Sequence, residues 1–229
     1  VEVQSYFDFT QASLEYSNLG GAGPDRATAN GDAIGQLIKL KSVAISPGGT
    51  VLDLFVLAST DYGAGVDTAQ NTLSGDFLRV NVATGSTVEL EFRLFDAATG
   101  QPAVVEQFEM SFFDLDTGAG GYTAEALLVD NDQYESMTVT TNSELDIFAA
   151  DTETGSGANA ATKRLTTVKA SSEGTDLDDP ASTGGMSASQ RAKAVQFSFV
   201  GRSSFKVSLQ VGEVRAGWQP SSRNFLIAG

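Results

Sequence analysis

Hydrophobic and polar residues alternate along most of this 229-residue chain with a period of two. The clearest example is the segment 88–94, Val-Glu-Leu-Glu-Phe-Arg-Leu, whose four large apolar side chains fall on one face and whose three charged side chains fall on the other. A period of two is that of a β-strand, because successive side chains point to opposite faces of a sheet. The segment therefore predicts a strand with one face in the core and the other in solvent.

Similar segments recur and predict about a dozen strands. Besides 88–94 they cover residues 3–9, 37–45, 51–57, 77–82, 108–113, 124–129, 137–141, 145–148, 195–200, 205–211 and 224–227. Glycine-rich turns and short connections between them favour antiparallel neighbours, and the last two long strands are expected to form a hairpin. The pattern predicts an all-β fold, an antiparallel, jelly-roll-like β-sandwich whose core is rich in the 14 phenylalanines.

Two stretches lack the alternation. Residues 17–34 predict a long loop, and residues 151–190 are rich in Gly, Ser, Thr, Ala and Asp. The second stretch resembles a linker, but the 39 residues beyond it are too few to form a second sandwich. We therefore predict that residues 1–229 form a single domain with a long surface excursion at about 151–190.

The chain contains no cysteine and no histidine. Disulfides, thiolate zinc sites and catalysis by a thiol or an imidazole are therefore excluded. An enzyme would have to use carboxylates, as glycoside hydrolases use two Asp or Glu residues about 5–10 Å apart. Glu89 and Glu91 share a strand face with Arg93, which favours a solvated outer face, and the one tryptophan, Trp218, is expected to close an end of the core. We expect no enzymatic activity.

The net charge of −15 argues against nucleic acid and anionic membranes as partners, because both demand clustered Lys and Arg. No apolar stretch approaches the roughly 20 residues of a membrane-spanning helix, so membrane insertion is not expected. A soluble module that is extracellular or on the cell surface fits this composition.

The charge is distributed unevenly along the chain. Residues 1–185 hold 28 acidic and 8 basic residues, whereas residues 186–229 hold 1 acidic and 6 basic residues. Complementary charge selects partners and register, so one hypothesis is a basic edge that meets an acidic face of another copy. The alternative is that the last strands happen to carry these cations.

A cluster of acidic residues follows the strand predicted at 108–113. Asp114 and Asp116 leave that strand on the same side, a glycine-rich turn follows, and Glu125, Asp130 and Asp132 come next. Calcium prefers six to eight oxygen ligands of this kind, although the spacing is not that of an EF-hand. These five residues are candidate calcium ligands, and a solvated acidic turn is the alternative.

The same region resembles β-sandwich modules of secreted and cell-surface proteins of microbes and algae. The resemblance is carried by Phe-Phe-Asp-Leu-Asp at 112–116, the glycine turn with Tyr122, Glu125 at the start of a strand, Tyr134 before Met-Thr-Val at 137–139, and Ser-Arg-Asn-Phe-Leu at 222–226. It implies a β-sandwich that is often stabilised by a metal and often adhesive or structural, with Asp114, Asp116 and Glu125 at the matching positions.

Two functions follow as hypotheses. The first is a non-enzymatic extracellular structural protein that self-associates head-to-tail, with other copies of itself as partners, into a filament, sheet or surface layer. The alternative is a calcium-dependent carbohydrate-binding or adhesive module, with glycans as partners.

Overall fold

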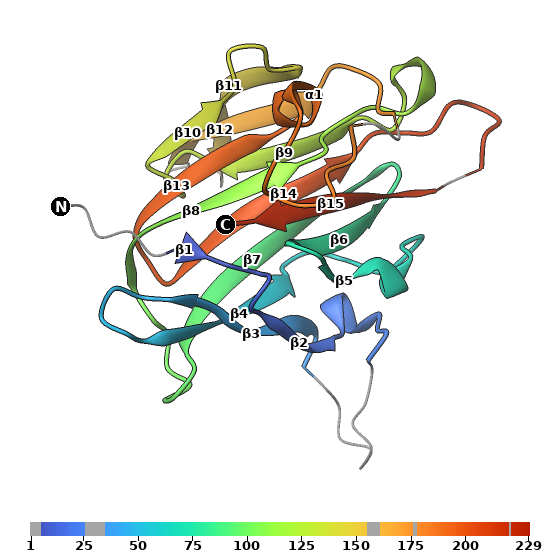
Figure 1. Cartoon of the computed structure of the whole chain (residues 1–229). Helices are drawn as coiled ribbons and strands as arrows, with labels where there is room; N and C mark the ends of the chain where they lie inside the picture. Colours follow the sequence, from blue (N-terminus) through green and yellow to red (C-terminus); the bar gives the residue numbers. More distant parts are fainter. Residues whose placement is uncertain (1–5, 26–34, 155–160, 176–177, 220) are drawn as a thin grey trace.

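The computed structural model describes residues 6–25, 35–154, 161–175, 178–219 and 221–229. Within these residues the chain forms two antiparallel β-sheets that pack face to face, which confirms the predicted all-β sandwich (Figure 1). Of the expected segments, residues 3–5 of the first strand, 26–34 of the first long loop, and 155–160 and 176–177 of the second stretch lie outside the described residues. No helix of the described part is long and apolar enough to cross a membrane.

The larger sheet has nine strands in the order β1-β3-β4-β7-β14-β9-β12-β11, with β2 also paired to β3. Its strands are β1 (Tyr6–Phe7), β2 (Ser13–Ser17), β3 (Leu37–Ile45), β4 (Val51–Ala58), β7 (Ser86–Asp96), β9 (Glu125–Asp130), β11 (Leu145–Thr154), β12 (Ala161–Ala170) and β14 (Ser204–Val211).

The smaller sheet has six strands in the order β10-β13-β8-β15-β6-β5. Its strands are β5 (Thr72–Ser74), β6 (Phe77–Ala83), β8 (Val105–Phe113), β10 (Ser136–Val139), β13 (Val195–Arg202) and β15 (Ser222–Ala228). The helical elements are one short α-helix, α1 (Ala188–Ala192), and the 3-10 turns η1 (Leu19–Gly21), η2 (Thr68–Gln70) and η3 (Ala119–Gly121).

Strand β7 shows why the alternating segments fold as predicted. Its apolar residues at 88, 90, 92 and 94 are buried, and its charged residues lie on the outer face. There Arg93 lies 2.7 Å from Glu91, and Lys206 of β14 lies 2.6 Å from Glu89. The two glutamates therefore belong to a solvated outer face, as expected.

The predicted hairpin between residues 195–200 and 205–211 is wrong. Strand β13 pairs with β10 and β8 in the smaller sheet, whereas β14 pairs with β7 and β9 in the larger one. The turn at Gly201, where φ is +62°, carries the chain across the sandwich. Phe199 and Phe205, on either side of the turn, then face each other across the core with ring centroids 4.1 Å apart.

The stretch expected as a surface excursion, residues 151–190, contains a full strand. Strand β12 lies between β9 and β11, and Thr166 and Val168 on its inner face are buried. Sequence pattern missed it because three of its ten residues are threonine and two are alanine, so apolar side chains mark its inner face only weakly.

Most of the C-terminal cations are engaged within the chain. Lys193, Lys206 and Arg223 form ion pairs with its acidic side chains, and Arg202 donates a hydrogen bond to the carbonyl of Asp132. These four cations therefore contact acidic side chains or a backbone carbonyl of the same chain, some of them buried and some on the outer surface.

Phenylalanines from both sheets meet in the core. Phe108 and Phe199 of the smaller sheet are stacked with centroids 5.0 Å apart, and Phe92 and Phe205 of the larger sheet are stacked at 4.7 Å. Phe108 also lies 5.8 Å from Phe205. Offset and edge contacts of this kind add to the free energy gained from burial alone.

We predict that Phe205→Ala destabilises the fold by about 3–5 kcal/mol, because it leaves a cavity where four rings meet. Val104→Ala is the matched control, since Val104 is 71% exposed. Urea denaturation measures both, and a loss below about 1 kcal/mol for Phe205→Ala would show that the rings do not hold the sheets together.

Candidate metal site

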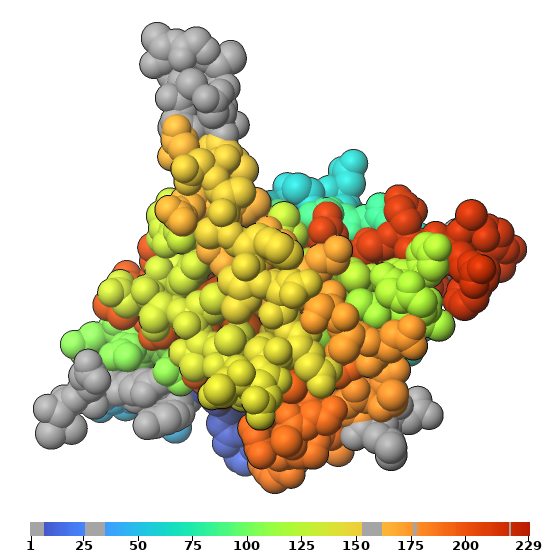
Figure 2. Space-filling model, turned by 90° about the horizontal axis from the view of Figure 1, so that it is seen from above, coloured from blue at the N-terminus to red at the C-terminus, as the bar shows by residue number. Residues whose placement is uncertain are grey.

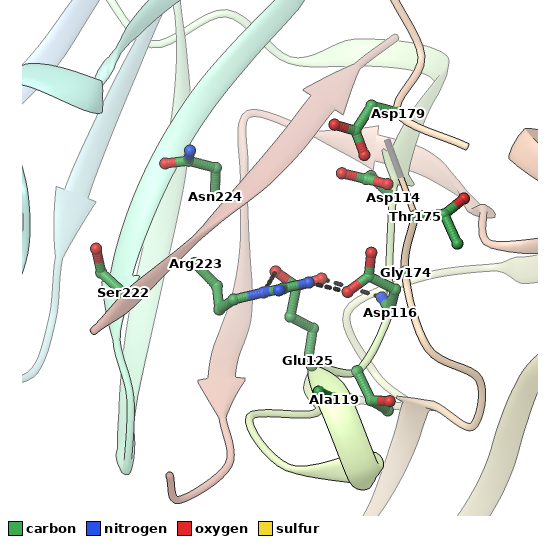
Figure 3. Close-up of a pocket in the computed structure, with 12 residues that line it drawn as sticks. Asp114, Asp116, Ala119, Glu125, Gly174, Thr175, Asp179, Ser222, Arg223 and Asn224 are labelled. Atoms are coloured by element: carbon green, nitrogen blue, oxygen red, sulfur yellow. Dashed lines mark hydrogen bonds and ion pairs between the residues drawn. The ribbon is translucent and has the colours of Figure 1, made fainter. Parts of the chain in front are cut away.

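A polar pocket opens where the chain leaves β8, enters β9 and enters β15. Its lining residues come from three parts of the sequence: the loop 114–125, Gly174, Thr175 and Asp179 of the segment after β12, and residues 222–224 (Figure 3). The first part links the two sheets, since β8 belongs to the smaller sheet and β9 to the larger. The pocket thus lies at one end of the sandwich, where strands of both sheets end.

Asp114 and Asp116 come together through an unusual backbone conformation. The backbone changes from an extended to a left-handed conformation at Asp114, whose φ is +61°. The side chain of the next residue, Leu115, is fully buried. Positive φ is uncommon for residues other than glycine, and aspartate is among the side chains that tolerate it best. The turn anchors the apolar side chain in the core and directs both carboxylates into the pocket.

Glu125 closes the same loop from the other side. Its Oε2 accepts a hydrogen bond from the backbone N–H of Asp116 at 3.1 Å, and its own N–H donates to the carbonyl of Asp116, also at 3.1 Å. Glu125 is only 1% exposed. Its carboxylate is therefore part of the wall and holds the loop in place.

Arg223 supplies the cation beside these acids. Leu226 of β15 pairs with Phe113 of β8, and the same register carried three residues further places Arg223 opposite Asp116. Its Nη2 pairs with Asp116 Oδ1, and its Nε lies 3.3 Å from Glu125 Oε1. One guanidinium thus bridges two buried carboxylates, which offsets part of their desolvation cost.

The segment after β12 forms the third wall. The N–H of Thr117 donates to the carbonyl of Ser172 at 2.8 Å, and the N–H of Gly174 donates to the carbonyl of Thr117 at 3.0 Å. Gly174 passes so close to Asp116 that a Cβ atom there would lie 1.7 Å from Asp116 Oδ2. A residue without a side chain is needed at this position.

A buried ion pair holds this segment in place. Lys193, at the end of α1, lies 2.7 Å from Asp178 Oδ2 and donates to the carbonyl of Glu173 at 2.7 Å. Both charged side chains are almost fully buried. Burial opposes ionisation of Asp178, but hydrogen bonds from Lys193 and Thr175 outweigh it and lower its pKa to about 2.

Three carboxylates converge in the pocket. One oxygen from each of Asp114, Asp116 and Asp179 lies within 4.8 Å of the others. Figure 3 shows Asp179 directly beside Asp114, with Asp116 next to the Arg223 guanidinium. Asp114 Oδ1 is inaccessible to solvent and has no hydrogen-bond partner among the described residues. A buried carboxylate oxygen in this state lacks the partner that offsets its desolvation.

Ionisation of the pocket acids is opposed by their surroundings. Burial, together with the charge of Asp179, raises the pKa of Asp114 to about 7. Burial, with the charges of Asp114 and Asp179, raises the pKa of Glu125 well above its ordinary value. Burial lowers the pKa of Arg223, an effect that the charge of Asp114 partly offsets. The site therefore holds more negative charge than its single arginine balances.

The structure brings together three of the five residues that the sequence suggested as ligands. Asp114, Asp116 and Glu125 line the pocket. Asp130 lies at the far end of β9, about 16 Å away by the rise of a strand, where it pairs with Lys163 at 2.8 Å. Asp132 follows in the turn after β9. These two belong to a separate part of the surface.

Sequence reasoning missed Asp179 and Arg223 as site residues. Asp179 lies in the stretch taken for a surface excursion, and its approach to Asp114 depends on the ion pair that anchors the segment. Arg223 is part of the sequence motif 222–226 at the start of β15, but only the pairing of β15 with β8 reveals which acidic residues it faces. Trp218, expected to close the core, is instead 53% exposed on the loop before β15.

No known family model matches the chain, and no curated protein matches its sequence. Among solved structures the chain is similar to the crystal structure of the N-terminal domain of the Streptococcus gordonii adhesin Sgo0707, with 10% sequence identity and a TM-score of 0.46. The match covers 95% of this chain and 49% of that one, so this chain spans about half the length of the adhesin domain. So distant a likeness carries nothing about what this chain binds.

The raised pKa of Asp114 predicts how stability depends on pH without metal. Between its ordinary value of 3.8 and about 7, the folded protein retains a proton that the unfolded chain has lost. Asp114 therefore contributes stability that is fully present below pH 3.8 and is lost as the pH rises through 7. In EDTA, we expect the loss of this contribution to lower the melting temperature between about pH 4 and pH 7, and we expect a smaller fall in Asp114→Asn. An equal fall in both proteins would contradict this assignment.

The close approach of Gly174 predicts a second effect. Gly174→Ala places a methyl group on Asp116 and forces the carboxylate away from Arg223, with a loss of about 1–3 kcal/mol. Gly184→Ala is the control, because nothing lies within 4 Å of a Cβ atom there. Thermal unfolding compares the two, and equal stability of both variants would contradict the contact.

Proposed function

We propose that this chain is a non-enzymatic adhesive or structural module that binds calcium in the pocket of Asp114, Asp116 and Asp179. The observation that carries the proposal is the buried, unpartnered Asp114 Oδ1 beside the two other carboxylates. A divalent cation would supply the missing partner and balance the excess negative charge.

The spacing of the three carboxylates fits one ion. Calcium binds oxygen at about 2.3–2.6 Å, so two of its ligand atoms are at most about 4.6–5.2 Å apart. The three aspartate oxygens lie within 4.8 Å of one another. Calcium takes six to eight oxygens, and the pocket is also lined by Thr117, Thr175, Ser222 and Asn224, residue types that carry hydroxyl or amide oxygens.

A carboxylate enzyme is the competing interpretation, because two acids with raised pKa values share the pocket. Glu125, however, is fixed by the backbone N–H of Asp116 and by Arg223, and it is almost fully buried. An acid or base must reach its substrate. The arrangement therefore favours a structural role for Glu125.

Calcium in this pocket would tie together segments that are far apart in the sequence. Asp114 and Asp116 follow β8, and Asp179 belongs to the segment anchored by Lys193. Arg223 links the same acids to β15. A cation held between these segments would make the end of the sandwich rigid, and such an end can present loops such as that of Trp218 to a partner.

Thermal unfolding with calcium tests the metal site. With calcium 100-fold above its dissociation constant, we expect stabilisation by about 2.7 kcal/mol, equivalent to about 5–10 °C in melting temperature. Asp114→Asn removes an ionisable ligand and should abolish most of this shift, with a matching loss of the calcium signal in titration calorimetry.

Asp130→Asn is the matched control, since it makes the same chemical change at the other end of β9. The control should retain the full calcium shift. If calcium produces no shift in the unaltered protein, or if both variants lose it equally, the pocket is not a calcium site. A glycan array probed in calcium and in EDTA then tests the adhesive role, for which we expect calcium-dependent binding.

A further inference from the structure

The last strand of the larger sheet, β11, has an unpaired edge. It pairs with β12 along its whole length, and within the described residues no strand lies on its other side. Residues coloured as β11 lie in the middle of the face seen from above in Figure 2. A long exposed edge strand presents backbone groups that can pair with another strand.

The hydrogen bonds of β12 show which way its backbone groups point. The N–H of Asn131 donates to the carbonyl of Arg164 at 2.8 Å, so the backbone groups of Arg164 point toward β9. Successive residues of a strand direct these groups to alternate sides. Leu165 therefore directs its N–H and C=O toward β11, where it pairs with Ala150.

The same alternation applies along β11. Ala150 and Phe148 direct their backbone groups toward β12, which leaves Ile147 and Ala149 with theirs directed outward. A hydrogen bond just before β11 shows the same alternation. The N–H of Ser171 donates to the carbonyl of Glu144, so Glu144, like Phe148 and Ala150, directs its carbonyl toward the β12 side. The free edge is thus centred on residues 147–149.

Apolar side chains are exposed on both faces of this edge. Ile147 pairs with buried Val168 and so lies on the inner face, yet it is 42% exposed because the smaller sheet does not cover it. Phe148 lies on the outer face and is 54% exposed. Another strand laid along β11 would cover both side chains.

Charge favours a second copy of the chain at this edge. With a net charge of −15, two copies repel each other over most of their surfaces. The segments 145–154 and 161–170 that form the hairpin carry three acidic and three basic residues, so together they are neutral. Asp146 and Asp151 of β11 stand in register with Lys169 and Arg164 of β12, so cations lie beside the acids of the edge strand and repulsion between copies is smaller here than over the rest of the surface.

We propose that two copies of this chain form a two-fold symmetric dimer through antiparallel pairing of their β11 strands, centred on Phe148. Ile147 then pairs with the partner's Ala149 through outward-facing backbone groups, and Phe148 faces the partner's Phe148. Asp146 stands opposite the partner's Ala150, so like charges are not directly opposed. The contact is closed, because a two-fold interface uses the same surface on both copies.

A single cysteine tests this register, because the chain has none of its own. Opposed residues of a pair without backbone hydrogen bonds have Cα atoms about 4.5 Å apart, within the range of a disulfide. Phe148→Cys should therefore form a covalent dimer under mild oxidation at least ten-fold faster than Val104→Cys, which changes an exposed residue directly before β8. Equal rates for the two variants would overturn the proposal.

A proline tests the backbone pairing in the protein without cysteine. Ala149→Pro removes an outward-directed N–H that β12 does not use, so the hairpin is retained while pairing between copies is blocked. In light scattering after size-exclusion chromatography in EDTA, we expect a concentration-dependent dimer whose dissociation constant rises at least ten-fold in this variant. Ala150→Pro, whose N–H points toward β12, should instead lower the melting temperature.

Two results would overturn the proposal in this second test. The first is that the protein stays monomeric up to millimolar concentration. The edge of β11 would then pair with a strand of another protein, not with a second copy. The other is a dimer that Ala149→Pro does not weaken, which would place the contact elsewhere. Because these measurements are made in EDTA, they are independent of the calcium site.

Discussion

Burial of the aromatic layer between the two sheets is the constraint on which the rest of the structure depends. The chain has no cysteine, so no disulfide joins the sheets, and contacts such as that between Phe199 and Phe205 must hold them together. The long strands at the centre of both sheets turn one face toward this layer, which accounts for the alternation along the sequence and for the passage of the chain from one sheet to the other at Gly201. The polar pocket lies beside this layer, where β8 ends and where β9 and β15 begin.

At the end of the sandwich that holds the pocket, buried charged side chains replace the apolar side chains of the core. Asp116 and Glu125 are nearly inaccessible, and they are tolerated because Arg223 and backbone N–H groups contact them. Breaking a buried pair of this kind leaves an uncompensated charge, which costs much more than the intact pair gains. The excess of carboxylates over cations, with Asp114 in a left-handed conformation, marks the place where the fold accepts strain and repulsion. A bound divalent cation would relieve the repulsion between the carboxylates.

The pocket and the free edge of β11 are different kinds of surface. The pocket is polar, concave and built from three segments, whereas the edge is one strand with apolar side chains on both faces. In the proposals made above, the edge would join copies of the chain, and a cation in the pocket would make the end of each copy rigid. The proposed dimer is closed, whereas the head-to-tail assembly expected from the charge pattern would be open; three of the six C-terminal cations on which that expectation rested form ion pairs within the chain.

The sequence by itself determined the class of fold, because the alternation of side chains is a local property of each strand. It also determined that Asp114, Asp116 and Glu125 lie close together, because they flank a single loop. Only the tertiary structure decided that β13 and β14 belong to different sheets, since amphipathic strands have the same local pattern whichever sheet they join. Only it could separate Asp130 and Asp132 from the pocket and bring in Asp179 and Arg223. Contacts across more than 40 residues of sequence depend on strand register and on the buried Lys193–Asp178 pair, and neither leaves a periodic signal in the chain.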